Sequence, residues 1–389
     1  MAIAETEGPH AELLAWRAEL PILAETIYLV NNSLGAMPRA VAAELARYAD
    51  TWGHRGVRAW AEGWWESPIA VGDLLAPPLG VAPGTVAMQP NVAVALAVFL
   101  SAIDYPAGRN RLVTSELEFP NVRYVLEGEK RKGAEIVVVP GAGGELPAEL
   151  LAAAIDDRTR LVVTSHALFR TGYLVDAAAV ASRCREAGAL FLLDVYQSVG
   201  ALPVELDAWG VDAAVGGSVK FLCGGPGAGF LWVRPELAER LAPAVTGWQA
   251  DAEPFAFRGG PIRHARGAWR FLTGTPGIPA LHACVPGYRM VAAAGIGAIR
   301  ARSLFLTARL IERADAHGLE VRTPRDPGRR AGAVTVFHPD GARIQKALEA
   351  RGVICDHRPG SGLRFGPHFY NTAAECDRAI DTLSEIAER

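Results

Sequence analysis

The sequence lacks any apolar run long enough to cross a membrane. Glycine, proline or a charged residue interrupts each apolar segment before about 18 residues. The N-terminal segment MAIAETEGPHAELLAWRAEL is acidic and contains no basic region followed by an apolar stretch, so it does not resemble a secretory signal peptide. We therefore expect a cytoplasmic protein that does not associate with membranes.

Cysteine is scarce, and no two cysteines have the CxxC spacing typical of metal sites. The five cysteines are Cys184, Cys223, Cys284, Cys355 and Cys376. Their odd number and wide separation argue against a disulfide framework, so we expect reduced structural thiols. The sequence predicts no metal site.

No run of basic residues stands out either. The 39 lysines and arginines are balanced by 42 acidic residues, for a net charge of −3. Neither nucleic acid nor an anionic membrane is therefore an expected partner. No internal repeat or low-complexity tract is evident, and 389 residues suffice for two lobes that share a core.

The middle of the chain alternates short β-rich runs with amphipathic helical stretches. The predicted strands are Arg111–Thr114, Glu135–Val139, Leu161–Thr164, Leu190–Leu193, Ala213–Gly216 and Gly229–Val233. The predicted helices include Asn121–Lys132, Pro147–Ile155 and Ala177–Ala187. This alternation predicts βαβ units and an α/β fold, with a mainly parallel sheet between two layers of helices. Ligands of such sheets lie beyond the carboxyl ends of the strands, so the loops there should carry the chemistry.

After about Pro279 the pattern changes to that of a smaller α+β domain. Its predicted elements are a long helix over Pro286–His317, a strand at Ala333–Phe337, a helix near Gly341–Arg351, the strand-like GVIC and a last helix from Thr372. The Gly/Pro/Arg-rich stretch Thr323–Gly332 is predicted to be a surface loop. We expect an N-terminal arm (1–45) that packs with the small domain, a large domain (46–280) and a small domain (281–389).

Asp194 ends the apolar run LFLLD and is followed by the turn-like YQSVG. A carboxylate beside an apolar core is costly unless it meets a cation or a strong donor. The protonated pyridine nitrogen of pyridoxal 5′-phosphate (PLP) is such a donor. Gln197, on the same turn, can donate to the phenolic oxygen of that cofactor. An aspartate that only caps the following turn is the alternative.

Lys220 lies 26 positions after Asp194, in AAVGGSVKFLCGGPGAGFLWV. Glycines and apolar residues flank it, and little in this segment would keep a lysine in water. A desolvated lysine has a lowered pKa, which imine chemistry requires. The spacing of Asp194 and Lys220 favours a PLP site over a solvated surface lysine.

Asn91 lies at a strand-to-helix junction in VAMQPNVAVALAVFL. Free backbone N–H groups at the start of a helix can bind phosphate. An ordinary N-cap by Asn91 is compatible with that function.

Several segments, in order, resemble those of the kynureninases, within the class V branch of the aspartate-aminotransferase-type PLP enzymes. They are YLVNNSLGAMP, WGHRGVRAW with GWWESP, FPNVRYVLEG, SHALFRTG, LLDVYQSVGALPVEL, the Lys220 segment, FLTGTPGI and DHRPGSGLRFGPHFYNT. The resemblance extends over nearly the whole chain. It implies PLP fold type I, with a seven-stranded, mainly parallel sheet, and a homodimer with shared active sites.

The resemblance also implies roles for individual residues around the cofactor. Lys220 would be the Schiff-base lysine and the proton shuttle, Asp194 would pair with the pyridinium and Gln197 with the phenolic oxygen. Phe119 would stack on the cofactor ring, with a core aromatic as the alternative. The phosphate would be held by Asn91, Val92 and Ser218, and by Thr275 from the second subunit. His166 and Thr171 would lie near the ring edge, although His166 is equally consistent with an interior histidine.

On the substrate side, Arg364 would bind the α-carboxylate bidentately. The substrate side chain would be bordered by Asn32, Ser33, Trp64, Trp65 and Trp248.

Three positions depart from the kynureninase pattern. Val219 stands where kynureninases carry Tyr before the lysine, and Val122 where they carry Asp. Gln197 replaces their His, as in cysteine desulfurases and related C–S lyases. Desulfurase chemistry itself needs a nucleophilic cysteine on the loop before the carboxylate-binding arginine, and the segment His357–Gly362 contains none.

These features predict a PLP-dependent lyase or hydrolase that acts at Cβ of a modified amino acid. The bond is Cβ–S of a cysteine S-conjugate or Cβ–Cγ of a kynurenine-like substrate, and a role in natural-product biosynthesis is one expectation. The alternatives are oxidative decarboxylation with deamination, transamination, or a PLP-binding regulator without activity.

Overall fold

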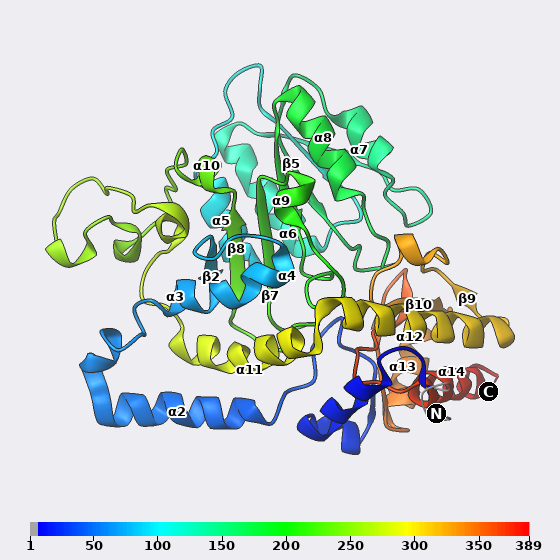
Figure 1. Cartoon of the computed structure of the whole chain (residues 1–389). Helices are drawn as coiled ribbons and strands as arrows, with labels where there is room; N and C mark the ends of the chain where they lie inside the picture. Colours follow the sequence, from blue (N-terminus) through cyan, green and yellow to red (C-terminus); the bar gives the residue numbers. More distant parts are fainter. Residues whose placement is uncertain (1–6, 389) are drawn as a thin grey trace.

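A seven-stranded sheet forms the centre of the larger part of the molecule (Figure 1), whose computed structural model describes residues 7–388. The strands, in spatial order, are β2 (Val86–Gln89), β8 (Gly229–Val233), β7 (Ala213–Gly217), β6 (Leu190–Asp194), β5 (Thr159–Ser165), β3 (Arg111–Ser115) and β4 (Glu135–Val139). The five neighbouring strands β7, β6, β5, β3 and β4 run parallel to one another. β8 is antiparallel to both of its neighbours, β2 and β7. The predicted α/β fold with a mainly parallel sheet is confirmed.

Two apolar layers cover this sheet, because successive strand residues point to opposite faces. In β6, Phe191 and Leu193 contribute to one core and Leu192 to the other. The first layer contains α7 (Ala148–Ala154), α8 (Ala177–Ala187), α9 (Leu206–Trp209) and α11 (Ile278–Ala294). The second contains α5 (Val92–Leu100), α6 (Pro120–Gly128) and α10 (Pro235–Ala238).

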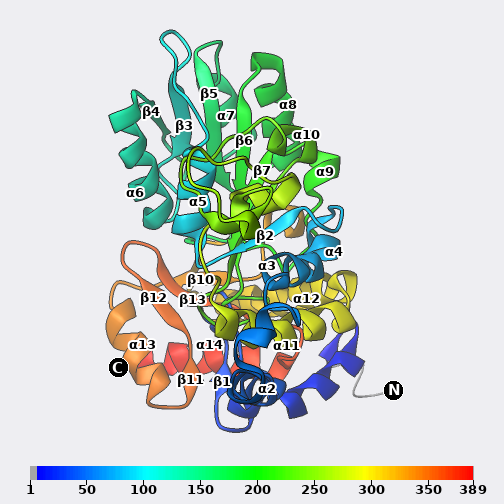
Figure 2. The same ribbon diagram turned by 90° about the vertical axis from the view of Figure 1, so that its left-hand side faces the viewer.

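The smaller part of the chain lies below the large sheet in Figure 2. Its four-stranded antiparallel sheet has the order β12 (Asp356–Arg358), β13 (Gly362–Phe365), β10 (Val334–Phe337) and β9 (Glu320–Val321). The helices α12 (Ile296–Ala316), α13 (Gly341–Glu349) and α14 (Ala373–Ala387) surround a core of its own. A capping box at Thr372 and Glu375 starts α14 where the sequence predicts.

The predicted single helix over 286–317 is wrong. The structure has two helices, α11 and α12, bent by 83° at Gly295. Gly295 has φ 79° and ψ 123°, a conformation outside the helical region that glycine adopts without strain. Among residues 7–388, no single helix is long and apolar enough to span a membrane. Within the same residues, α11 and α12 taken together are the one pair with sufficient length and apolar composition, and the pair is bent.

The predicted surface loop 323–332 is exposed only in its middle. Thr323, Arg330 and Ala331 are buried. Arg330 donates to Thr307 Oγ1 of α12 at 3.0 Å and to the carbonyl of Arg325, so its guanidinium has partners that permit burial.

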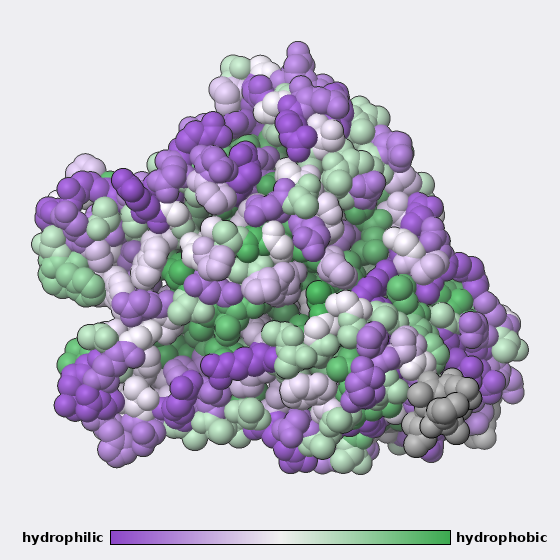
Figure 3. Space-filling model, in the orientation of Figure 1, coloured by the Kyte–Doolittle hydropathy of each residue, from purple (hydrophilic) through white to green (hydrophobic). Residues whose placement is uncertain are grey.

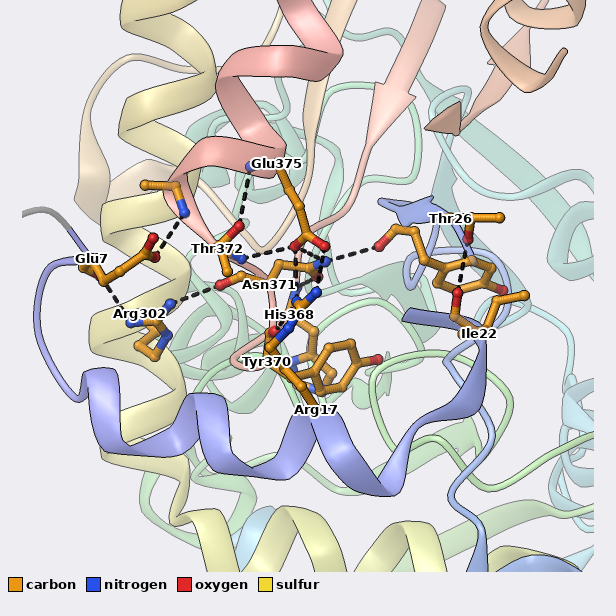
Figure 4. Close-up of polar contacts among 12 residues, drawn as sticks. Glu7, Arg17, Ile22, Thr26, Arg302, His368, Tyr370, Asn371, Thr372 and Glu375 are labelled. Atoms are coloured by element: carbon orange, nitrogen blue, oxygen red, sulfur yellow. Dashed lines mark hydrogen bonds and ion pairs between the residues drawn. The ribbon is translucent and has the colours of Figure 1, made fainter. Parts of the chain in front are cut away.

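The N-terminal arm is attached to the C-terminal segment (Figure 4). Arg17, in the 3₁₀ segment Ala11–Glu19, donates to both carboxylate oxygens of Glu375, at 2.8 and 3.0 Å. Asn371 donates to the carbonyl of Tyr28 at 3.1 Å. β1 (Ile27–Tyr28) pairs in parallel with β11 (Val353–Ile354). These contacts hold the residues after β1 at the edge of the large sheet.

The helix α2 (Ala40–Arg55) follows the arm and lies along α11 (Figure 1), and the short helices α3 (Ser67–Ala70) and α4 (Ala76–Leu79) lead into β2. α11 contributes Leu281, Cys284 and Met290 to the core of the large sheet. The domain boundary at residue 280, which assigns α11 to the small domain, stays a prediction.

Candidate active site

The carboxyl ends of β3, β5, β6 and β7 meet at one edge of the large sheet, as parallel strands require. A cavity of about 510 Å³ lies there, within the range of ligand pockets. Predicted site residues that line it are Asn32, Ser33, Asn91, Val92, Phe119, Asp194, Gln197, Lys220 and Arg364. These side chains are far apart in the sequence and come together in the fold.

Lys220 and Asp194 form an ionisable pair in this cavity, in which Asp194 is buried and Lys220 is partly buried. Lys220 follows β7, and burial lowers the pKa of its amine to about 7, while the Asp194 carboxylate opposes the change. Asp194 ends β6 and is 6% exposed; burial raises its pKa, and the Lys220 ammonium lowers it. Asp194 Oδ1 accepts a hydrogen bond of 2.8 Å from the backbone N–H of Tyr196, which fixes the orientation of the carboxylate.

The amino end of α5 lines the same cavity. Asn91 caps this helix by accepting from the N–H of Val94 at 3.0 Å. Gly229, at the start of β8, lies against Asn91, and a Cβ atom at position 229 would come within 2.8 Å of Asn91 Cα. The glycine therefore lets the strand approach the helix end, where N–H groups and the helix dipole favour an anion.

Arg364 of β13 is almost fully buried, and Asp356 of β12 holds it. Its Nε and Nη2 donate to the two Asp356 oxygens at 2.7 and 2.5 Å, and Nη1 donates to the Phe169 carbonyl at 2.6 Å. A guanidinium has five N–H groups, so one remains on each Nη atom. Arg358 also contacts Asp356, at 2.9 Å, so two guanidinium groups share one carboxylate. The net positive charge of this trio matches one substrate carboxylate.

Phe119 lines the cavity and is 44% exposed. The preceding residue, Glu118, is buried and accepts hydrogen bonds from Ser115 at 3.0 Å, Thr164 at 2.8 Å and Ser165 at 2.5 Å. These hydroxyls belong to β3 and β5. Glu118 therefore ties the Phe119 loop to two strands of the sheet.

Three residues predicted to contact the cofactor of their own subunit do not line this cavity in the structure. Ser218 is fully buried, and its hydroxyl donates to the Ala228 carbonyl at 2.5 Å and contacts the Tyr288 hydroxyl. The His166 ring packs on Trp209, 4.8 Å between centroids, and burial lowers its pKa to about 4. Thr171 donates to the Gly144 carbonyl at 2.9 Å. The packing of the His166 ring matches the interior alternative for that residue, although its Nδ1 has no hydrogen-bond partner among the residues that the structure describes. The cofactor contacts expected for Ser218 and Thr171 stay predictions.

The tryptophans and Thr275 also lie away from this cavity. Trp64 stacks on Tyr48, with 5.4 Å between ring centroids. Trp65 packs edge-on against Trp248 at 4.7 Å. Thr275 lines a separate small hollow beside Gln249. Within one chain, the three tryptophans do not border the substrate space predicted for them. The contact of Thr275 with the cofactor phosphate of a second subunit stays a prediction.

The sequence prediction missed Glu118, Tyr196, Asp356 and Arg358. Tyr196 and Arg358 line the cavity, and the other two hold residues that line it. All four lie inside or beside the segments already singled out by Phe119, Asp194 and Arg364, so proximity to those motifs was the available signal. Among residues 7–388, no group of three or more His, Cys, Asp or Glu side chains could hold a metal ion.

The lining residues fit PLP, which needs an amine, a carboxylate for its ring nitrogen, a phosphate site and a ring contact. Lys220, Asp194, the start of α5 and Phe119 offer these four groups around one cavity. Gln197 also lines it, and its Nε2 donates to the Asn32 carbonyl at 3.1 Å.

Comparison with known proteins agrees with this chemistry. The chain is 34% identical over 400 residues to a kynureninase of Burkholderia pseudomallei, with 99% of the chain and 94% of that protein covered. A kynureninase of Pseudomonas fluorescens is 34% identical, with 93% and 89% covered.

Among solved structures, the apo cysteine desulfurase of Thermococcus onnurineus has a TM-score of 0.85 at 18% identity, covering 98% of each chain. The cystine C–S lyase C-DES, in complex with cysteine persulfide, has a TM-score of 0.85 at 21% identity, covering 94% of this chain and 99% of that one. These likenesses concern the fold. The family model Aminotransferase class-V matches residues 92–378, and the chain therefore belongs to this family and is a PLP-dependent enzyme.

Proposed function

We propose that this enzyme breaks a bond at Cβ of a modified amino acid, either Cβ–Cγ of a kynurenine-like substrate or Cβ–S of a cysteine S-conjugate. The observation that carries the proposal is that Lys220, Asp194 and Arg364 line one cavity from three different elements. An amino acid held at its amine and its carboxylate leaves its side chain free to project into the rest of that space.

Each of these residues has a distinct task in the proposed reaction. Bound PLP supplies an electron sink at Cα of the amino acid. Lys220 takes the Cα proton, and a pKa of about 7 lets its amine act as a base near neutral pH. Asp194 holds the proton on the ring nitrogen, and Arg364 orients the α-carboxylate through its two remaining N–H groups.

The choice between the two bonds rests on the relatives and on the departures from their pattern. Kynureninases at 34% identity support Cβ–Cγ cleavage. Val219, Val122 and Gln197 differ from the kynureninase pattern and support a different side chain. Oxidative decarboxylation with deamination and transamination remain the alternative proposals, because the fold alone does not select the bond.

Product analysis separates these reactions. The purified enzyme with PLP is incubated with L-kynurenine and with S-benzyl-L-cysteine, and with Lys220→Ala as the control. Cleavage of Cβ–Cγ gives alanine and anthranilate, whereas elimination at Cβ–S gives a thiol, pyruvate and ammonia. Release of CO2, or a keto acid that retains the whole side chain, without any Cβ product would overturn the proposal in favour of the alternatives.

The proposed assembly is a homodimer in which Thr275 of one subunit reaches the cofactor phosphate of the other. It is supported by aromatic side chains exposed in one chain: Trp248, Phe255 and Phe257, with 42%, 59% and 76% of their surface accessible. They lie on the loop that projects from the body in Figure 1, across a recess from α2, and Figure 3 shows hydrophobic surface along this recess. Exposed apolar clusters of this kind are typical of interfaces.

A further inference from the structure

Tyr196 lies against the reacting end of Lys220. It follows Asp194 by two residues and lines the same cavity. The Lys220 Nζ atom is 4.0 Å from the centroid of the Tyr196 ring, and 5.9 Å from that of Phe119. An ammonium within about 6 Å of a ring centroid is attracted by the negative face of the ring. Tyr196 is therefore the closer of two aromatic rings around this amine.

The position of the Tyr196 ring depends on a glycine in the neighbouring strand. Gly217 ends β7, and a Cβ there would come within 2.7 Å of Tyr196 Cζ and 2.8 Å of its hydroxyl oxygen. Real Cβ atoms do not approach other atoms so closely, so any other residue at 217 would push the ring away. Gly217 and Tyr196 thus act as a matched pair.

The residue directly before the lysine cannot supply an aromatic contact. Val219 lines the cavity with an apolar side chain, as does Val122. Among the described residues that line this cavity, Tyr196 is the one phenol. Burial and the nearby Asp194 raise its pKa to about 12, so its ring is neutral at physiological pH.

We propose that Tyr196 is a catalytic residue whose ring holds the Lys220 ammonium whenever the amine is free, and so adjusts how readily Lys220 gives up its proton. This inference rests on the proposed role of Lys220 as the reacting amine. The ring attracts the charged amine and has no such interaction with the neutral one, so it favours the protonated form.

The other charges around Lys220 act in both directions. Asp194 and Asp356 favour the ammonium, whereas Arg364 and Arg358 oppose it, and burial lowers the lysine pKa more than any of them. Loss of the Tyr196 ring would add to the effect of burial. The pKa of Lys220 would then fall further, and a weaker base would remain to take the Cα proton.

The sequence makes a direct measurement practical. The chain contains only four lysines, Lys130, Lys132, Lys220 and Lys346. Full-length protein with ¹³C-labelled lysine Cε atoms, freed of PLP, therefore gives few NMR signals, and Lys220→Met identifies that of Lys220. The change of its chemical shift with pH gives the pKa of the amine.

Three variants test the inference. Tyr196→Leu keeps an apolar side chain but removes the ring, and should lower the pKa of Lys220 by about one unit, a tenfold change in proton affinity. Tyr196→Phe keeps the ring and should leave the pKa within about 0.3 units of the parent, since the attraction comes from the ring face. Gly217→Ala should displace the ring and lower the pKa in the same direction as Tyr196→Leu.

An unchanged pKa in Tyr196→Leu would overturn the inference, and an equal fall in Tyr196→Phe would do the same, because the hydroxyl and not the ring would then be responsible. The spread of the Lys130, Lys132 and Lys346 signals shows whether Tyr196→Leu folds. If it does not fold, the other two variants decide, because the inference requires the pKa of Lys220 to be lower in Gly217→Ala than in Tyr196→Phe. The proposed function fails by a separate observation, namely that added PLP gives no covalent attachment at Lys220 in the parent protein.

Discussion

Removal of Arg364 should abolish recognition of the α-carboxylate and leave most cofactor binding intact. Arg364→Ala deletes a guanidinium that has two N–H groups left after its bonds to Asp356 and Phe169. PLP is held by other elements, through Lys220, Asp194 and the start of α5. In this variant the affinity for ligands with an α-carboxylate should therefore fall, while the affinity for PLP should be largely kept.

The magnitude follows from the two hydrogen bonds that are lost. Hydrogen bonds to a charged partner contribute about 1.5–3 kcal/mol each, so two contribute about 3–6 kcal/mol. This range corresponds to a loss of at least about 100-fold in affinity for a ligand with an α-carboxylate. The cost in stability should be limited, because Arg358 still neutralises Asp356 in the variant.

A matched pair of ligands isolates this contribution. L-Alanine and ethylamine differ by the carboxylate, and each can be titrated against the holoenzyme by the change in cofactor absorption. In the parent enzyme L-alanine should bind at least about 100-fold more tightly than ethylamine, and in Arg364→Ala the two should bind within about threefold. PLP affinity, measured by the same absorption, should change by less than about threefold.

Two results would contradict this reasoning. One is an equal loss of PLP and L-alanine affinity in Arg364→Ala, which would make the residue a general support of the site. The other is a preference for L-alanine over ethylamine that survives the substitution. Arg364→Lys serves as the control for charge, since it keeps one positive charge without the planar fork and should recover only part of the preference.

Three further predictions address neighbouring features. Burial raises the pKa of Glu118, so the stability that this residue contributes is present at low pH and is lost as pH rises through the raised pKa. The unfolding free energy of Glu118→Gln should therefore increase relative to that of the parent as pH rises from about 4.5. A difference between the two proteins that stays constant with pH in denaturant titrations would argue against this. Cys355 is buried, and burial raises the pKa of its thiol, so Cys355→Ala should keep turnover within about twofold; a loss of tenfold or more would point to a nucleophilic thiol. Sedimentation should report a dimer for the parent, and Trp248→Asp should shift it toward monomer with weaker PLP binding, whereas the exposed Tyr124→Asp, on α6, should do neither.

Much of the fold could be predicted because its signals are local. Short apolar strands bounded by turns, as in LFLLD before Asp194, need only the neighbouring residues to be recognised. The break between α11 and α12 was missed because the apolar helical pattern continues through Gly295, and a single glycine within a helical pattern does not by itself end a helix.

The site could be predicted in part for the same reason. Asp194 ends a strand in the parallel part of the large sheet, and Lys220 and Phe119 follow two others; parallel strands bring their carboxyl ends to one edge. His166 and Ser218 also lie near strand ends, yet their side chains turn into the interior, where the His166 ring packs on Trp209 and the Ser218 hydroxyl donates to the Ala228 carbonyl. The direction of a side chain after a strand depends on what packs beside it, which the sequence does not state.

The sequence by itself determined the fold class, the family and the lysine–aspartate pair, since each of these depends on residue type and spacing along the chain. Only the tertiary structure decided how the charges and rings are arranged around that pair. Asp356 meets Arg364 because β12 and β13 pair as a hairpin. Tyr196 covers Lys220 because Gly217, in the adjacent strand, leaves space for the ring. Both contacts join residues on different elements, and their distances follow from packing in three dimensions.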